Sequence, residues 1–204
     1  MRLLTVVAFS IATMAVPANA SVLYTSGAID GNYNAIDVNH NKLTSSFTLS
    51  SDSTVTGFTF GGWSSLGNVI TAISWGISAT PDFRSDTNTA LTSDGRLPNT
   101  YPGYEIREYA GTFSPLVLAA GTYWLTLHDA TTSNNSPAYW DVNDGNTISY
   151  GNQAGAQIHS LSFSILGSAV SAVPELSTWA MMIGGFAMTG VAMRRRRTPA
   201  VAIA

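Results

Sequence analysis

The three histidines of the 204-residue chain are the first candidates for acid–base or metal chemistry. His40, His128 and His159 have no second His or Glu at metal-ligand spacing. His128-Asp129 could supply two members of a Ser-His-Asp site, but the chain has no Gly-x-Ser-x-Gly elbow to present a nucleophile. The absence of cysteine excludes thiol nucleophiles and thiolate metal sites. We therefore expect no catalytic residues and no enzyme activity, and a secreted hydrolase is the least favoured alternative.

Two acidic segments carry oxygen ligands of the kind that calcium prefers. Residues 141–146 have the sequence Asp-Val-Asn-Asp-Gly-Asn, and hard oxygen donors at alternate positions suit Ca²⁺. The spacing is one residue short of the EF-hand pattern, no Glu follows at the required distance, and a hairpin turn explains the segment as well. Asp30, Asn32 and Asp37 form a second, weaker candidate. We expect no cofactor, and a calcium-assisted, lectin-like carbohydrate-binding module remains the alternative.

Aromatic side chains are the other candidate binding groups, because their faces can stack on pyranose rings. Trp124 and Trp140 fall on the polar phase of their predicted strands, which favours exposure, so these two are the predicted carbohydrate contacts. Packing in the core is the alternative interpretation for any aromatic residue. The full set that could form a stacking platform is Trp63, Trp124, Trp140, Tyr101, Tyr104 and Tyr139.

Charge is sparse and unevenly distributed along the chain. Nine basic and twelve acidic residues make up only 10% of the sequence, which argues against a nucleic-acid-binding protein. Residues 21–172 hold four basic and eleven acidic residues, a net charge of −7, whereas residues 173–204 have a net charge of +3. The middle and the C-terminal end are therefore expected to have different roles.

The elements that must position these side chains are β-strands, because apolar residues alternate with polar ones along the middle of the chain. Turn signals such as Asp30-Gly31 and Asp144-Gly145 separate the strands. We expect an all-β ectodomain over residues 21–168, a two-sheet sandwich or jelly roll, with an exposed loop or hairpin at 79–102. The expected strands are 22–25, 43–50, 54–61, 68–78, 103–110, 113–118, 121–128, 137–142, 147–150 and 158–166.

The first 20 residues have the three parts of a secretory signal peptide. Arg2 precedes an uncharged, mostly apolar run from Leu3 to Val16, and Ala18 and Ala20 give the small-x-small cleavage pattern. We expect export and cleavage by signal peptidase after Ala20. A buried N-terminal strand or helix is the alternative.

The C-terminal end has the pattern of a membrane anchor. After a linker at 169–175, residues 176–193 carry no charge, and a helix of that length would reach about 27 Å, close to the thickness of a bilayer core. The basic tail 194–204 follows, and its arginines should remain cytoplasmic. We expect a transmembrane helix with the ectodomain in the periplasm. A core helix followed by a solvated basic tail is the alternative.

Pro174 and Glu175 precede the uncharged stretch, Trp179 and Ala180 lie near its start, and four arginines follow it. In this order the segment resembles a PEP-CTERM sorting signal of Gram-negative bacteria, in its PEPxxWA-type variant. Leu176 stands where the family has its second proline. The residues that match the signal are Pro174, Glu175, Trp179 and Ala180, followed by Arg194, Arg195, Arg196 and Arg197. The resemblance implies recognition and cleavage by an exosortase-like membrane protease, and delivery of the domain to the cell envelope or the extracellular matrix.

These features together predict an exported, non-catalytic protein. We expect it to be anchored in the inner membrane as a precursor and then to be associated with exopolysaccharide or biofilm in the envelope or outside the cell. The expected partners are the export machinery, signal peptidase, an exosortase-like protease and exopolysaccharide.

Overall fold

The computed structural model describes residues 20–32, 34–81, 87–151, 157–170 and 186–190. The chain divides into two units, residues 1–170 and 171–204, and the β-domain belongs to the first. Several predicted features lie outside the described residues. They are residues 1–19 of the signal peptide, among them Ala18, most of the linker, the motif residues Pro174, Glu175, Trp179 and Ala180, and the arginines Arg194–Arg197.

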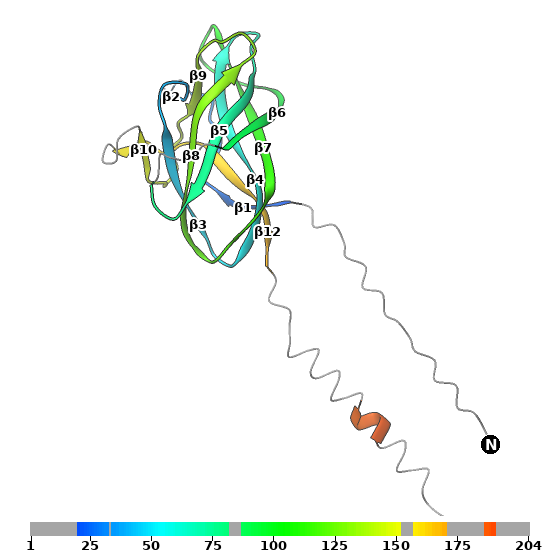
Figure 1. The fold of residues 1–204 in the computed structure, drawn as a ribbon. Helices are drawn as coiled ribbons and strands as arrows, with labels where there is room; N and C mark the ends of the chain where they lie inside the picture. The colour runs from blue at the N-terminus through cyan, green and yellow to red at the C-terminus, as the bar shows by residue number, and fades with distance from the viewer. Residues whose placement is uncertain (1–19, 33, 82–86, 152–156, 171–185, 191–204) are drawn as a thin grey trace, which may run out of the picture. The chain divides into compact units, whose positions relative to one another are not determined.

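The described residues of the first unit form twelve antiparallel strands (Figure 1). They are β1 (Ser21–Thr25), β2 (Ala35–Asp37), β3 (Leu43–Leu49), β4 (Ser53–Ser65), β5 (Ile70–Ser78), β6 (Thr87–Leu97), β7 (Tyr104–Leu118), β8 (Gly121–Thr132), β9 (Ala138–Asp141), β10 (Ser149–Gly151), β11 (Gln157–Ile158) and β12 (Phe163–Ala169). The prediction of an all-β domain is confirmed, and all of its strand pairs are antiparallel among the described residues.

Strand β6 joins two halves of one continuous sheet. Its residues Thr87–Ala90 pair with β5, and its residues Leu91–Leu97 pair with β7. On the β7 side the order is β6-β7-β4-β12-β1, and β9 and β2 extend it beside β4; we refer to this part as the β4 half. On the β5 side the order is β6-β5-β8-β3-β10-β11, which we refer to as the β8 half.

The core lies between these two halves, because the sheet folds back on itself (Figure 1). Phe47 of β3 packs its ring 6.4 Å from that of Phe163 on β12, although the two strands lie far apart in the sheet order. Leu125 and Leu127 of β8 are fully buried in the same cluster as Phe58 of β4. Burial of these side chains from both halves is the main source of the domain's stability.

Four strand predictions need correction, and one of them is the strand expected at 158–166, whose residues are divided between β11 and β12. The stretch 79–102, expected to be an exposed loop or hairpin, contains β6, which is paired on both of its edges. The two strands expected at 103–110 and 113–118 are one strand, β7. The short strand β2 was not predicted, and it is held by pairing with β9.

The predicted membrane helix at 176–193 falls largely outside the described residues. Residues 186–190 of this segment are helical, with Phe186 and Met188 exposed. Across the part of the chain that the structure describes, no helix is long and apolar enough to cross a bilayer.

Candidate functional site

Two loops cover the outer face of the β4 half, the face that points away from the core. Residues 26–34 follow β1, and residues 98–103 follow β6. They touch at Gly31, whose carbonyl oxygen accepts a hydrogen bond of 3.2 Å from the backbone N–H of Thr100. Gly31 has a φ of +67°, and a Cβ there would collide with the carbonyl oxygen of Pro98. A glycine is therefore needed where the loops meet.

A groove of about 280 Å³ lies on this outer face, and we call it the β4 groove. Residues 27–29 form one wall, while Leu97 of β6 and Glu108 of β7 form the other. The floor consists of residues from β4 and β12, among them Thr59, Gly61 and Ser164. The groove thus combines hydroxyl groups, one carboxylate and aliphatic side chains.

Gly61 allows the loop wall to approach the sheet closely. A Cβ at this position would lie 2.5 Å from Oγ of Ser162 and 3.0 Å from Cγ1 of Ile29. Any larger side chain would push the 26–34 loop outward and reshape the groove.

A cluster of tyrosines continues the groove along β4. Trp63 lies two residues beyond Gly61 on the same face of the strand, and Tyr104, Tyr139 and Ala35 surround it in a smaller pocket. The ring centroids of Tyr101 and Tyr104 are 5.4 Å apart, and those of Tyr104 and Tyr139 are 5.9 Å apart. We call Tyr101, Tyr104 and Tyr139 the tyrosine cluster; all three side chains are half-buried.

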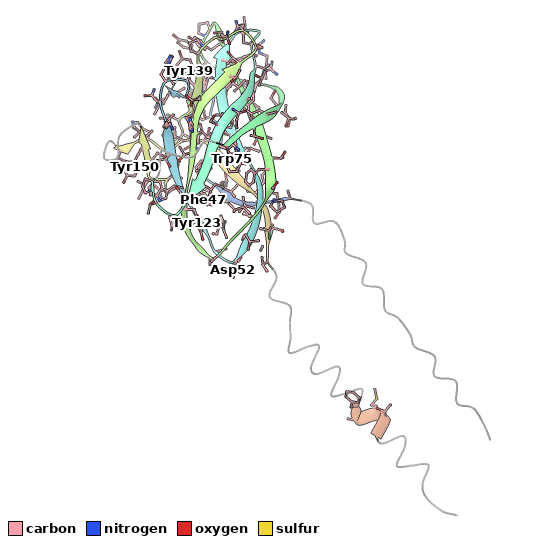
Figure 2. The ribbon with its side chains drawn as sticks, viewed as in Figure 1. Phe47, Asp52, Trp75, Tyr123, Tyr139 and Tyr150 are labelled. Atoms are coloured by element: carbon pink, nitrogen blue, oxygen red, sulfur yellow. The ribbon has the colours of Figure 1, made fainter. Side chains whose placement is uncertain are left out.

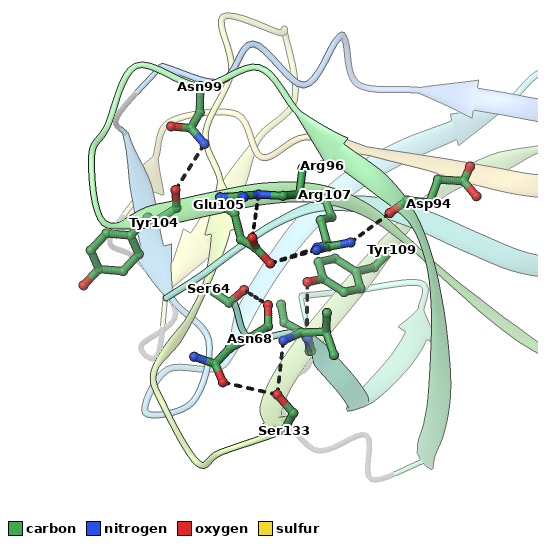
Figure 3. Close-up of polar contacts among 12 residues, drawn as sticks. Ser64, Asn68, Asp94, Arg96, Asn99, Tyr104, Glu105, Arg107, Tyr109 and Ser133 are labelled. Atoms are coloured by element: carbon green, nitrogen blue, oxygen red, sulfur yellow. Dashed lines mark hydrogen bonds and ion pairs between the residues drawn. The ribbon is translucent and has the colours of Figure 1, made fainter. Parts of the chain in front are cut away.

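Asn99 fixes the loop that carries Tyr101. Its Oδ1 accepts a hydrogen bond from the backbone N–H of Tyr101. Its Nδ2 donates a hydrogen bond to the carbonyl of Tyr104 (Figure 3). The structure therefore brings together three of the six aromatic residues that the sequence proposed for a stacking platform, with Trp63 buried behind them.

Trp140 has a different role from the predicted one. Its side chain is fully buried, and its Nε1 donates a hydrogen bond of 2.8 Å to the carbonyl of Ser162. Its ring packs against Phe60 and Phe163 in the core. A residue in this position cannot stack on a sugar at the surface, so the prediction of exposure is wrong for Trp140.

Trp124 lies on the outer face of the β8 half, away from the β4 groove. It is half-buried, and its ring centroid is 5.4 Å from that of Tyr150. Its cross-strand neighbours are Ser46 and Ser78. Trp124 thus retains a partly accessible ring, and its predicted contact with carbohydrate stays a prediction.

The two candidate calcium segments make internal hydrogen bonds. Oδ1 of Asp141 accepts from Nε1 of Trp63 at 2.7 Å, and Oδ1 of Asn143 accepts from the N–H of Gly145. The Asp30 carboxylate accepts two hydrogen bonds from Asn32, and Asp37 accepts from Asn39 and His40. Among the described residues, no group of three or more His, Asp or Glu side chains is arranged to hold a metal ion.

Asp141 is a buried carboxyl group with an incomplete set of partners. It is fully buried, and within the described residues its Oδ2 has no hydrogen-bond partner. Burial raises the pKa of Asp141 to about 6, although the hydrogen bond from Trp63 opposes the shift, and the charge of Asp30 adds to it. The carboxyl therefore titrates within the range of ordinary buffers.

We expect Asp141→Asn to stabilise the domain at neutral pH. Because the folded pKa lies above the ordinary value of 3.8, the folded state binds the proton more tightly than the unfolded state. The contribution of this carboxyl to stability is then greatest below about pH 4 and is lost as the pH rises to about 6 and the buried group ionises. The amide keeps the acceptor for Trp63 without the charge, so the gain should be about 1–3 kcal/mol at pH 7.

Urea unfolding at pH 4 and pH 7 measures this gain, which should be nearly absent at pH 4. Asp144→Asn is the matched control, because Asp144 is exposed and its substitution removes the same charge from the neighbouring loop. A variant of Asp141 that loses stability at pH 7 would contradict the expectation.

The histidine considered for hydrolase chemistry is enclosed by the sheet. His128 is only 2% exposed, and its Nδ1 lies 2.8 Å from Oδ2 of Asp129. Ser74 lies opposite His128 in the β5–β8 register. The Ser74 hydroxyl accepts a long hydrogen bond of 3.5 Å from Nδ2 of Asn88. The imidazole is thus poorly placed to reach a substrate in solution.

The groove residues Thr59, Leu97, Glu108 and Ser164 were not singled out from the sequence. Each is an ordinary strand residue, and they meet only because β12, β4, β7 and β6 are neighbours in the sheet. A lone acidic residue in a strand, such as Glu108, is the one signal that could have suggested a role.

No protein-family model matches this chain, and no curated protein matches it.

Proposed function

We propose that this chain is an exported, non-catalytic protein of the cell envelope or extracellular matrix, sorted by a PEP-CTERM-like tail and associated with exopolysaccharide. In this proposal the two halves of the sheet form a two-layer, jelly-roll-like sandwich, and residues 176–193 form a transmembrane helix in the precursor. The β4 groove and the tyrosine cluster are the surface that contacts polysaccharide.

The observation that carries the sorting part is the order of segments along the chain. A signal-peptide pattern, a β-domain, a Pro174-Glu175 element, an uncharged stretch and four consecutive arginines follow one another. Four guanidinium groups resist translocation, so this order favours a domain outside the cytoplasm and a tail inside it. The partners are the export machinery, signal peptidase and an exosortase-like protease.

The position of the tyrosine cluster within the domain supports the polysaccharide part. The chain enters the domain at β1 and leaves it after β12, and Ser21 pairs with Gly167. Ser53 of β4 pairs with Ala169 at that end, whereas Trp63 pairs with Tyr139. Ten residues of strand, about 33 Å, separate the two positions, and Figure 2 shows Asp52 and Tyr139 at opposite ends of the domain. The tyrosine cluster therefore lies far from both chain exits.

We expect Glu175→Ala to make the precursor accumulate in the inner membrane, because the substitution removes the charged residue of the sorting motif. Immunoblotting of membrane and secreted fractions, with mass spectrometry of the mature ends, measures the processing. Ser177→Ala, two residues away at a variable position of the motif, is the control and should mature normally. Unchanged maturation of the Glu175 variant, or a precursor found in the soluble fraction, would argue against the sorting function.

A further inference from the structure

We propose that the β4 groove accepts an uncharged sugar unit and rejects a uronic acid unit, and that Glu108 is the residue that makes this distinction. The inference rests on the proposed contact with polysaccharide and adds the chemical class of the polymer.

The polar groups of the groove suit hydroxyl donors. Glu108 is exposed, and the structure gives it no hydrogen bond or ion pair among the described residues. An ionised carboxylate has two acceptor oxygens, so it can take hydrogen bonds from two neighbouring hydroxyls of a sugar ring. Thr59 and Ser164 pair with each other across β4 and β12 on the groove floor, and each adds a hydroxyl that can donate or accept.

The glycine opposite Glu108 lets the loop wall come close to the floor of the groove. Glu108 pairs with Gly61 of β4, and Ile29 of the loop wall lies within 3.0 Å of the place where a Cβ of residue 61 would stand. Leu97 and Ile29 supply aliphatic surface on the opposing walls, and such surface suits the C–H faces of a pyranose ring. The volume of about 280 Å³ is close to the lower end of the usual range for small-ligand pockets, roughly 300–1,000 Å³.

The electrostatics of the groove disfavour an anionic sugar. No basic residue is among the described residues that line it. Arg96 and Arg107, the arginines of β6 and β7, are both paired with the buried carboxylate of Glu105. A uronate carboxylate in the groove would therefore face Glu108 without a counter-charge, and like charges at close range repel.

The test compares two probes, a neutral β-glucan oligosaccharide and an oligouronate of matched length, by titration calorimetry on the purified mature protein. We expect the neutral probe to bind and the oligouronate to bind at least about tenfold more weakly, or about 1.4 kcal/mol. Glu108→Gln should weaken the affinity for the neutral probe by about tenfold, the effect of losing a charged hydrogen-bond acceptor. It should also reduce the ratio between the affinities for the neutral probe and the oligouronate. Repeating the titrations with a calcium chelator should change neither affinity.

Asp52→Asn is the matched control for loss of one negative charge. Asp52 does not line the groove and lies at the end of the domain opposite Tyr139 (Figure 2), and its Oδ1 accepts a hydrogen bond from the N–H of Ala120, a bond that asparagine retains. This variant should bind both probes as the original protein does. Equal or tighter binding of the oligouronate, or an unchanged ratio in the Glu108 variant, would overturn the inference while leaving polysaccharide contact intact. Absence of binding to either probe and to a wider glycan array would overturn the proposed polysaccharide contact as well.

Discussion

Trp140→Ala is expected to destabilise the domain by about 3–5 kcal/mol, the usual cost of emptying a large aromatic site in a core. The side chain is fully buried, and its ring centroid lies 6.2 Å from that of Phe60 and 6.0 Å from that of Phe163. The substitution also leaves the carbonyl of Ser162 without the indole donor. Domains of this size have a free energy of unfolding of about 5–15 kcal/mol, so the loss is a large fraction of the total and should lower the denaturant midpoint strongly.

Denaturant unfolding followed by circular dichroism measures this loss, and Trp124→Ala is the comparison. Trp124 is half-buried and packs on Tyr150, so its removal should cost only about 1 kcal/mol. Trp140→Phe keeps an aromatic ring but loses the bond to Ser162, and its cost should lie between those of the two alanine variants. A Trp140→Ala variant that keeps its stability and loses only affinity for glycans would show that the ring is a ligand contact rather than part of the core.

Strands with one buried and one polar face could be predicted from the sequence. In β3 the buried Leu43, Phe47 and Leu49 alternate with more polar residues, and in β12 Phe163 and Ile165 do the same. Alternation of this kind is a local property, because the side chains of a strand point to opposite faces in turn. The all-β class therefore followed from the sequence without any knowledge of which strands are neighbours.

The error at Trp140 has a long-range cause. In β9 both Trp140 and the adjacent Asp141 are fully buried, because one faces the core and the other lies beneath the loop at 26–34. When both faces of a strand are covered, polarity no longer indicates which face is inside. The covering loop is more than a hundred residues away in the sequence, so no local pattern could have placed it over β9.

Strand β6 was missed because its sequence offers little apolar surface to bury. Of its residues, only Ala90, Leu91 and Leu97 are apolar, and most of its side chains are exposed. It is held by backbone pairing on both edges, with β5 and with β7, and such pairing does not depend on side-chain type. The β4 groove was unpredictable for the same reason, since Leu97 of this strand forms part of its wall.

Glu105→Gln is expected to cost about 3 kcal/mol of stability, because it removes the shared counter-charge of two arginines. Glu105 is 1% exposed; its Oε2 lies 2.6 Å from Nε of Arg96, and its Oε1 lies 3.0 Å from Nη2 of Arg107 (Figure 3). Arg96 is half exposed and can return to water, but the side chain of Arg107 is only 19% exposed. The substitution would thus leave a largely buried guanidinium whose charge is no longer balanced.

Glu108→Gln is the matched control for this prediction, since it makes the same chemical change three residues along β7 at an exposed position. Its effect on the free energy of unfolding should be within about 0.5 kcal/mol. The loss in free energy of unfolding for Arg96→Ala should lie between those of the two glutamate variants, at about 1 kcal/mol. The ion pair between Glu105 and Arg107 remains in this variant, and an exposed ion pair contributes little. Equal losses for the two glutamate variants would mean that Glu105 does not stabilise the arginines, and that β6 and β7 are held together by their backbone hydrogen bonds alone.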